Sequence, residues 1–414
     1  MRSMAWIMAL AVLASAASAG ENWPEFRGPG RNGHSDARGL PLTWSQTENI
    51  KWKTPIHDRG WSSPVIWADQ IWLTTATKNG RQMFAVCVDR KTGKIVHDVK
   101  VFDVAKPDRI ASMNTYASPT PAIEAGRVYV HFGTYGTACL DTKTAQVLWA
   151  RRDLKCEHHM GPGSSLMLFE KLLIFHVDGC DVQYVVALDK ATGKTVWKTD
   201  RSVDYSRIHR FTRKAFCTPI LIEWSGRLEM ISPASRALLA YDPRSGQELW
   251  KVRHGGWSMT PRPLFGHGLL FVIVDYDYPE LWAVRPGGKG DVTDTHVAWK
   301  IPRGKHMPQK PSLLLVGQLI YLISDRGVAG CVEAKTGRIV WQKRLPGEYS
   351  ASPIYADGRI YLFSERCQTT VLQPGRECKV LATSELDGRV MASPAVAGKA
   401  IFLRTETHLY RIEK

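Results

Sequence analysis

A short turn motif recurs along this chain and limits its fold more than any other feature. The clearest copy, Ala187 to Trp197, reads ALDKATGKTVW. Its aspartate can accept hydrogen bonds from the backbone of the turn, and its Thr-Gly pair allows the chain to reverse. The valine and tryptophan that follow suit a half-buried, pleated strand. The motif therefore predicts a tight hairpin between two β-strands.

Copies of this hairpin return about every 40 to 55 residues, a spacing typical of propeller blades. Besides Asp189 to Trp197, the copies run from Val88 to Lys94, Leu140 to Trp149, Tyr241 to Trp250, Val284 to Trp299 and Val332 to Trp341, with degenerate copies at Val371 to Gly375 and Leu409 to Ile412. The motif thus indicates eight repeats.

A second marker has the same period. A Ser/Thr-Pro pair, or a stretch that replaces it, precedes a short apolar strand in each repeat, and proline at the first residue of a strand loses no ladder hydrogen bond. On this basis the blades are expected to begin near Ser63, Ser118, Ser164, Thr218, Thr260, Pro311, Ser352 and Ser393. The first blade should contain strands at Val65–Trp67, Ile71–Thr75, Met83–Val88 and Lys94–Val99.

The two markers together predict an all-β, eight-bladed β-propeller of four-stranded antiparallel blades, spanning residues 50–414. The last blade has sequence for only three strands, so we expect the N-terminal strand Ile50–Thr54 to supply the fourth and close the ring. Residues 20–49 contain the sequence WPEFRGPGRNG and should form an extended arm packed on the propeller.

Residues 1–19 have the pattern of a cleaved signal peptide: Arg2, an apolar core, and Ala17-Ser18-Ala19. No later stretch is long and apolar enough to span a bilayer. We therefore expect a periplasmic or extracellular protein with no transmembrane segment and no lipid anchor.

The cysteines do not form a recognisable disulfide framework. Cys87, Cys139 and Cys331 share one repeat position with Ala187 and Ala240, which indicates small buried core residues. Cys367 and Cys378 flank one strand and are poorly placed to pair. A single disulfide among Cys156, Cys180 and Cys217 stays possible.

The repeat Leu188 to Trp197 and its copies resemble the tryptophan-docking repeat of PQQ-like eight-bladed β-propellers. The family includes quinoprotein dehydrogenases, which bind PQQ and Ca²⁺ over the propeller mouth, and BamB, a non-catalytic scaffold. The resemblance implies that the tryptophan of one blade packs on the glycine turn of its neighbour. The chain lacks the adjacent cysteine pair of many quinoprotein alcohol dehydrogenases and the lipobox cysteine of BamB, so no catalytic residue can be transferred to it.

Candidate ligand-binding residues lie in the variable loops on the face opposite the repeated turns. Aromatic and basic side chains there are expected to surround the mouth of the central channel, where they could bind a glycan, a peptide or a planar anionic cofactor; the alternative is that the aromatic residues pack between blades. The candidates are Arg59, Trp61, Tyr116, His209, Arg210, Phe216, Trp257, His306, Tyr349 and Arg389.

Two loops of the same face are weak candidates for a metal site. Cys156-Glu157-His158-His159 and Asp178-Gly179-Cys180-Asp181 should lie close together, and His158, His159, Asp178 and Asp181 are possible ligands. The alternatives are a Cys156–Cys180 disulfide or ordinary loop residues, because no ligand pair has a recognised metal spacing.

The chain has 414 residues and a net charge of +16, which favours acidic partners. Export argues against nucleic acid, and no pair of titratable groups has the pattern of an acid–base site. The sequence therefore favours a monomeric, non-catalytic scaffold that binds protein or an anionic glycan. The alternative is a quinoprotein alcohol or sugar dehydrogenase that uses PQQ with calcium.

Overall fold

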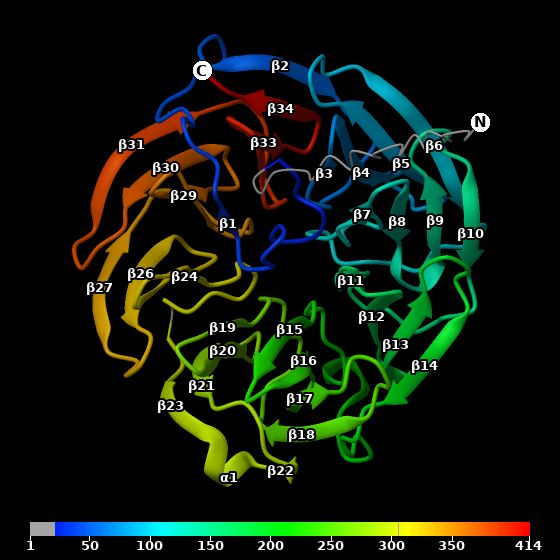
Figure 1. Ribbon diagram of the computed structural model, residues 1–414, viewed down its shortest axis with the longest axis vertical. Coiled ribbons are helices and arrows are strands. Elements are labelled where there is room, and N and C mark those ends of the chain that lie inside the picture. The colour runs from blue at the N-terminus through cyan, green and yellow to red at the C-terminus, as the bar shows by residue number, and fades with distance from the viewer. Residues whose placement is uncertain (1–20, 305) are drawn as a thin grey trace, which may run out of the picture.

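The computed structural model describes residues 21–304 and 306–414, so the expected signal peptide lies outside the described residues. Eight sheets are arranged in a ring, as Figure 1 shows, and each contains a four-stranded antiparallel blade. This confirms the predicted eight-bladed propeller.

The first four blades follow the chain in order. Blade one comprises β3 (Val65–Trp67), β4 (Gln70–Ala76), β5 (Gln82–Asp89) and β6 (Ile95–Asp103). Blade two comprises β7 (Ala122–Glu124), β8 (Arg127–His131), β9 (Thr137–Asp141) and β10 (Val147–Arg151). Blade three comprises β11 (Met167–Phe169), β12 (Leu172–Asp178), β13 (Gln183–Asp189) and β14 (Thr195–Asp200). Blade four comprises β15 (Ile220–Trp224), β16 (Arg227–Ala234), β17 (Ala237–Tyr241) and β18 (Glu248–Arg253).

The remaining blades repeat the scheme. Blade five comprises β19 (Leu264–Gly266), β20 (Leu269–Val274), β21 (Glu280–Val284) and β23 (Val297–Ile301). Blade six comprises β24 (Leu314–Val316), β25 (Leu319–Ile323), β26 (Val328–Glu333) and β27 (Ile339–Arg344). Blade seven comprises β28 (Ile354–Ala356), β29 (Arg359–Phe363), β30 (Gln368–Gln373) and β31 (Lys379–Glu385). Blade eight comprises β32 (Ala395–Ala397), β33 (Ala400–Arg404), β34 (His408–Ile412) and β2 (Ile50–Pro55).

The ring closes as predicted, because β2 pairs antiparallel with β34 and joins the two ends of the propeller. Two blades carry an additional short strand: β22 (Gly290–Asp291) pairs with β18, and β1 (His34–Ser35) pairs with β28. The helical segments among the described residues are α1 (Thr293–His296) and 3₁₀ turns at Gly133–Tyr135 and Arg210–Thr212. Within this part of the chain, no helix has the length and apolar character needed to cross a membrane.

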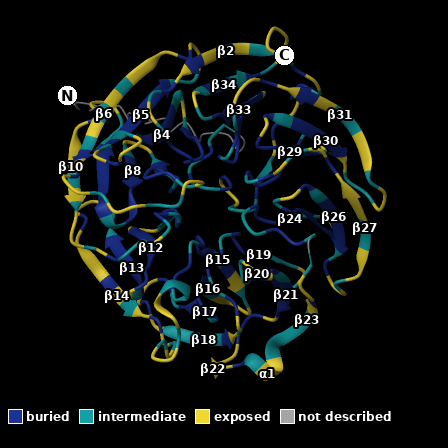
Figure 2. Ribbon diagram, turned by 180° about the vertical axis from the view of Figure 1, so that it is seen from behind, coloured by how far each residue is buried: buried dark blue, intermediate teal, exposed yellow. Residues whose placement is uncertain are grey.

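The core lies between the blades. The second and third strands of each blade are almost continuously buried, whereas the residues of the outer strands are mostly exposed or half-buried, as Figure 2 shows. The cysteines at the shared repeat position, Cys87, Cys139 and Cys331, are fully buried in this core. All eight cysteines lie in the described residues and are free thiols, so the possible disulfide between Cys156 and Cys180 is not formed.

The tryptophan of the repeat ties neighbouring blades together at the periphery. Trp197 of blade three donates its indole N–H to the carbonyl of Pro243 in the turn of blade four, at 3.2 Å. The turn glycine, Gly246, has φ +72°, and a Cβ there would lie 2.5 Å from the Trp197 ring. Glycine is required because it tolerates positive φ and leaves room for the indole. Equivalent bonds are made by Trp52, Trp149, Trp299 and Trp341.

Candidate functional site

The residue two places before each inner strand forms an inner ring around the propeller centre. These residues are Ser63, Thr120, Ser165, Thr218, Arg262, Ser312, Ser352 and Ser393. The backbone N–H of one ring residue donates to the hydroxyl of the ring residue in the next blade at six of the interfaces, with distances of 2.9 to 3.1 Å. The Ser/Thr-Pro marker therefore has a structural role beyond opening a strand.

In two blades the predicted marker lies two residues upstream of the ring position. Ser118-Pro119 and Thr260-Pro261 are each followed by a second X-Pro pair, and this second pair carries the ring residue, Thr120 or Arg262. An arginine thus takes the place of a hydroxyl in blade five. The signal was present in the sequence, but the first proline pair obscured it.

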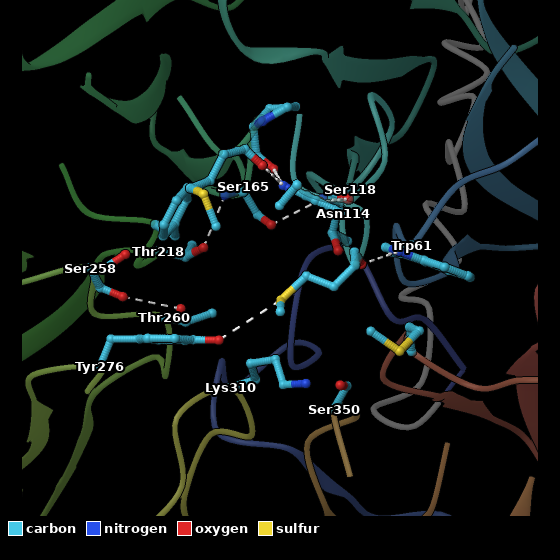
Figure 3. A pocket seen from close by; sticks show the side chains of 18 of the residues that line it. Trp61, Asn114, Ser118, Ser165, Thr218, Ser258, Thr260, Tyr276, Lys310 and Ser350 are labelled. Carbon is cyan, nitrogen blue, oxygen red and sulfur yellow. Dashed lines mark hydrogen bonds between the residues drawn. The ribbon is translucent and has the colours of Figure 1, made fainter. Parts of the chain in front are cut away.

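A cavity of about 360 Å³ lies inside this ring, on the face of the variable loops. Six of the ring hydroxyls line it, and we call them the hydroxyl collar: Ser63, Thr120, Ser165, Thr218, Ser352 and Ser393. Figure 3 shows collar residues from neighbouring blades on one side of the cavity, with Tyr276 and Lys310 on another.

The N-terminal arm forms the floor of the cavity. Trp23 pairs with Ile66 of β3 through two backbone hydrogen bonds of 2.8 Å, and Phe26 is among the lining residues. Figure 1 shows the arm crossing the centre of the ring before β1. The sequence predicted an arm packed on the propeller but did not place it inside the channel, because no repeat specifies where the arm enters.

Two buried guanidinium groups hold the arm in place. Arg262 donates to the carbonyls of Pro219 and Phe26 and forms an ion pair with Glu25 at 3.4 Å. Arg27 donates to the carbonyls of Pro353 and Leu313, at 2.5 and 2.6 Å. Arg27 has no carboxylate partner among the described residues, and burial together with nearby Arg262 lowers its pKa to about 9. The floor therefore carries excess positive charge.

The walls are mainly apolar and aromatic. Three of the predicted mouth residues line the cavity: Trp61, Phe216 and Trp257. Sequence reasoning missed the other large side chains of the wall, which are Met113, Met160, Met391 and Tyr276. The Tyr276 hydroxyl points toward the Met113 sulfur, at 3.9 Å (Figure 3). Met113, Met160 and Tyr276 lie in loops outside the repeat, so no periodic signal marked them. Met391 lies two residues before Ser393-Pro394, as Trp61 and Phe216 do before their own markers, and was missed because it is not aromatic.

Lys310 is a cation in the wall whose charge is already compensated. Its Nζ lies 3.3 Å from carboxylate oxygens of both Asp325 and Glu365. Burial disfavours the ammonium, but the two carboxylates outweigh it and raise the pKa of Lys310. Lys310 therefore stays protonated and is poorly suited to act as a base.

The remaining predicted mouth residues do not line this cavity. Arg59 and Tyr116 line a neighbouring one, and the Tyr116 hydroxyl donates to the Asp108 carbonyl. Tyr349 is fully buried and packs between blades. Both side chains also pack in the core clusters between blades, as the packing alternative described.

The basic candidates lie around the cavity. Arg389 forms an ion pair with Glu365, and its guanidinium and that of Arg59 flank the Trp61 ring at 6.0 and 5.7 Å. His209 and Arg210 are exposed on the loop before blade four, where Arg210 pairs with Glu157. His306 is half-buried outside the lining, and burial lowers its pKa.

The two loops considered for a metal site do lie against each other, since Cys180 N–H donates to the Glu157 carbonyl at 3.0 Å. The four candidate ligands, however, have separate partners. Asp178 is paired with Arg201, Asp181 accepts from the Glu157 N–H, His159 stacks on Phe211, and His158 Nε2 accepts from the Thr134 N–H. Among the described residues, no group of three or more His, Cys, Asp or Glu side chains is placed to hold a metal.

These lining residues do not fit PQQ with calcium. PQQ is a planar tricarboxylate, and Ca²⁺ takes six to eight oxygen ligands, commonly carboxylates. The acidic residue of the lining is Asp277, and its basic residue, Lys310, is already paired twice. The described lining thus offers too few carboxylates for the ion and no free cation for the cofactor.

Solved structures share the fold at low sequence identity. BamB from Moraxella catarrhalis matches with a TM-score of 0.59 and 12% identity, covering 87% of this chain and 99% of its own. Quinohemoprotein alcohol dehydrogenase from Comamonas testosteroni matches with a TM-score of 0.66 and 10% identity, covering 96% and 81%. The computationally designed Ika8 protein reaches a TM-score of 0.59 at 11% identity, covering 87% and 98%. A designed protein matches as well as BamB does, so this similarity concerns the fold alone.

Sequence comparison identifies the family. The Drosophila melanogaster beta-alanine-activating enzyme is 23% identical over 283 residues, which is 64% of this chain, and the chain spans a quarter of that protein's length. The sequence model described as outer membrane protein assembly factor BamB matches residues 42–285 and 234–390, most of the propeller. The chain therefore belongs to this family of PQQ-like β-propellers.

Proposed function

We propose that this protein is a non-catalytic binding propeller of the periplasm or cell exterior, whose axial cavity and surrounding loops hold a segment of a protein partner. The observation that carries the proposal is the cavity itself, which is closed below by the arm, walled by tryptophan, phenylalanine and methionine, and open to the loop face. Methionine side chains adapt to varied apolar groups, which suits a peptide better than a glycan.

The loops around the mouth support an acidic partner. Exposed basic residues occur on loops of several blades, and they include Lys78, Arg109, Arg207, Arg303 and Arg326. Met113 and Tyr278 on the same face are 44% and 60% exposed and offer apolar surface to a partner. Apolar contacts surrounded by cations are typical of a surface that recognises an acidic protein.

The alternative function is a dehydrogenase that uses PQQ with calcium. An aromatic cavity mouth and the fold of an alcohol dehydrogenase favour it. The residues of the lining argue against it. Lys310 is already ion-paired with two carboxylates, and Asp277 has no second carboxylate in the lining with which to bind calcium.

The proposal is tested by site-specific photo-crosslinking in the native host. A photoreactive amino acid replaces Met113 at the mouth or, as a control, Lys194 in a repeated turn on the opposite face. We expect one defined protein adduct from position 113 and none from position 194. An adduct of glycan rather than protein, or PQQ-dependent reduction of an electron-acceptor dye by the purified protein, would contradict the proposal.

A further inference from the structure

The hydroxyl collar has hydrogen-bond donors that the protein does not use. Thr120, Ser165, Thr218, Ser352 and Ser393 each accept a backbone N–H from the preceding blade. None of these hydroxyl protons, nor that of Ser63, has an acceptor among the described residues. A hydroxyl oxygen that accepts one bond keeps its O–H free to donate. The collar therefore presents six O–H donors to one cavity.

These donors are buried and held by the fold. Every collar residue is between 2% and 7% exposed, and each lies two residues before a rigid inner strand. The cavity they line is open to the loop face, so these O–H groups can donate to a ligand that enters it, and the collar is complementary to a ligand that supplies acceptors.

Charge decides which kind of ligand the collar suits, because hydroxyls can also bind cations through their oxygens. Arg27 donates to the Pro353 carbonyl, adjacent to Ser352, and Arg262 donates to the Pro219 carbonyl, adjacent to Thr218. Two guanidinium groups therefore lie directly beyond the collar, and Glu25 is shared between Arg262 and Arg31. This positive charge disfavours a cation and favours an anion in the low-dielectric floor.

The walls define the rest of the ligand. Above the collar, Trp61, Phe216, Trp257 and the methionines offer apolar surface, and Asp277 at the rim would repel a second negative charge near the mouth. The complementary molecule has an acceptor-only anionic end and an apolar body, which describes a carboxylate carried by apolar residues.

We propose that the hydroxyl collar binds the C-terminal carboxylate of a polypeptide whose last apolar side chains occupy the mouth. This inference rests on the proposed function and specifies which segment of the partner is held. Hydrogen bonds to an ionised group are stronger than neutral ones, so the carboxylate should contribute much of the affinity.

The test uses the mature protein and the peptide N-acetyl-Ala-Leu-Phe in two forms, the free acid and the C-terminal amide, titrated by calorimetry. We expect the acid to bind at least about tenfold more tightly than the amide, as one to two charge-assisted hydrogen bonds would give. T218V and S352A should reduce affinity for the acid toward that for the amide.

Ser312→Ala is the matched control. Ser312 also accepts a backbone N–H in the inner ring, from Arg262 at 3.0 Å, but it is not in the cavity lining. Its loss should weaken the blade interface as much as the test variants do and leave the acid's affinity unchanged.

Each outcome has a distinct meaning. If the wild type bound acid and amide equally and Trp257→Ala bound neither, the carboxylate proposal would be overturned. The cavity would still be a peptide-binding site. No binding of the acid at millimolar concentration would also overturn the carboxylate proposal, and the crosslinking at Met113 would still decide the proposed function. If 3-phenylpropionate bound as tightly as the peptide acid, a small free acid would replace the polypeptide C-terminus as the ligand.

Discussion

Two rings of hydrogen bonds join the blades, and they differ in whether their side chains keep a hydrogen-bond donor that the protein does not use. In the outer ring, the indole N–H of Trp197 or Trp149 donates its single proton to a turn carbonyl of the next blade. In the inner ring, hydroxyls such as those of Thr218 and Ser352 accept a backbone N–H but donate to no described residue. Both rings follow the same repeat. Under the proposed function, the outer ring serves stability alone, whereas the inner ring combines stability with binding.

The largest expected effect is in the outer ring. Trp197→Ala removes a side chain that is 8% exposed and fills the space beside Gly246. The free energy of unfolding should fall by about 3 to 5 kcal/mol, measured by guanidinium denaturation.

The neighbouring Val196→Ala serves as its control. Val196 is 53% exposed on the same strand, so its loss should change stability by less than about 0.5 kcal/mol. If the two variants lost similar amounts of unfolding free energy, the tryptophan dock would not be the main stabilising contact at the periphery.

Acid should weaken the blade interfaces nearer the centre before it affects the tryptophan docks. His131 of β8 is buried against Phe175 of blade three, with ring centroids 4.7 Å apart. Burial, with a smaller effect of His158, lowers its pKa to about 3. The unfolded chain, with a histidine pKa near 6.5, then binds the extra proton between about pH 6.5 and 3, so this contribution is present above pH 6.5 and is lost as the pH falls through that window.

The measurement is the free energy of unfolding as a function of pH for the wild type and for His131→Phe. The slope attributable to one histidine approaches about 1.4 kcal/mol per pH unit inside the window. The variant should have a shallower acid limb. An unchanged slope would mean that His131 is already protonated in the folded protein.

A smaller expected effect is the cost in stability of replacing a turn glycine by alanine. Two such variants separate the cost of the backbone conformation from the cost of the lost tryptophan packing. Gly246 and Gly226 both have positive φ, +72° and +74°, but a Cβ at Gly226 meets nothing within 4 Å, whereas at Gly246 it would clash with Trp197. Gly226→Ala should cost about 1 kcal/mol for the left-handed backbone. Gly246→Ala should cost about 1 kcal/mol more in denaturation experiments. Equal costs would mean that the indole moves aside freely.

Nearly all of the fold could be predicted from the sequence, because the same turn and strand motif recurs in each blade. Asp189, Gly193 and Trp197 specify a turn and the dock that packs on a neighbour, and the missing outer strand of blade eight pointed to Ile50–Thr54. Three interfaces depart from the pattern. Trp250 donates to Glu229 of its own blade and not to a neighbouring turn, and Ala382 takes the tryptophan position in blade seven. In blade one, His97 stands where tryptophan is usual, and it stacks on Trp72 of its own blade, at 5.8 Å. The facing turn has Ala145 in place of glycine, at φ +58°.

The candidate site was only partly predictable, because several of its components come from outside the repeat. Trp61, Phe216 and Trp257 precede the proline marker and were identified by their position. Phe26 of the arm and Tyr276 of a loop reach the cavity through connections that have no period. The Ser and Thr residues of the collar could be read from the sequence. Their proposed role in binding depends on which hydroxyl protons lack an acceptor, and only the arrangement of neighbouring blades shows that.

The most direct test of the central claim compares one variant from each ring in a single titration. The affinity of free-acid N-acetyl-Ala-Leu-Phe is measured for Thr218→Val and for Trp197→Ala at 15 °C, after circular dichroism has verified that both variants are folded. The two-ring interpretation predicts that Thr218→Val loses most of its affinity, while Trp197→Ala binds as the wild type does despite its lower stability. Equal loss in both variants, or loss in Trp197→Ala alone, would contradict it.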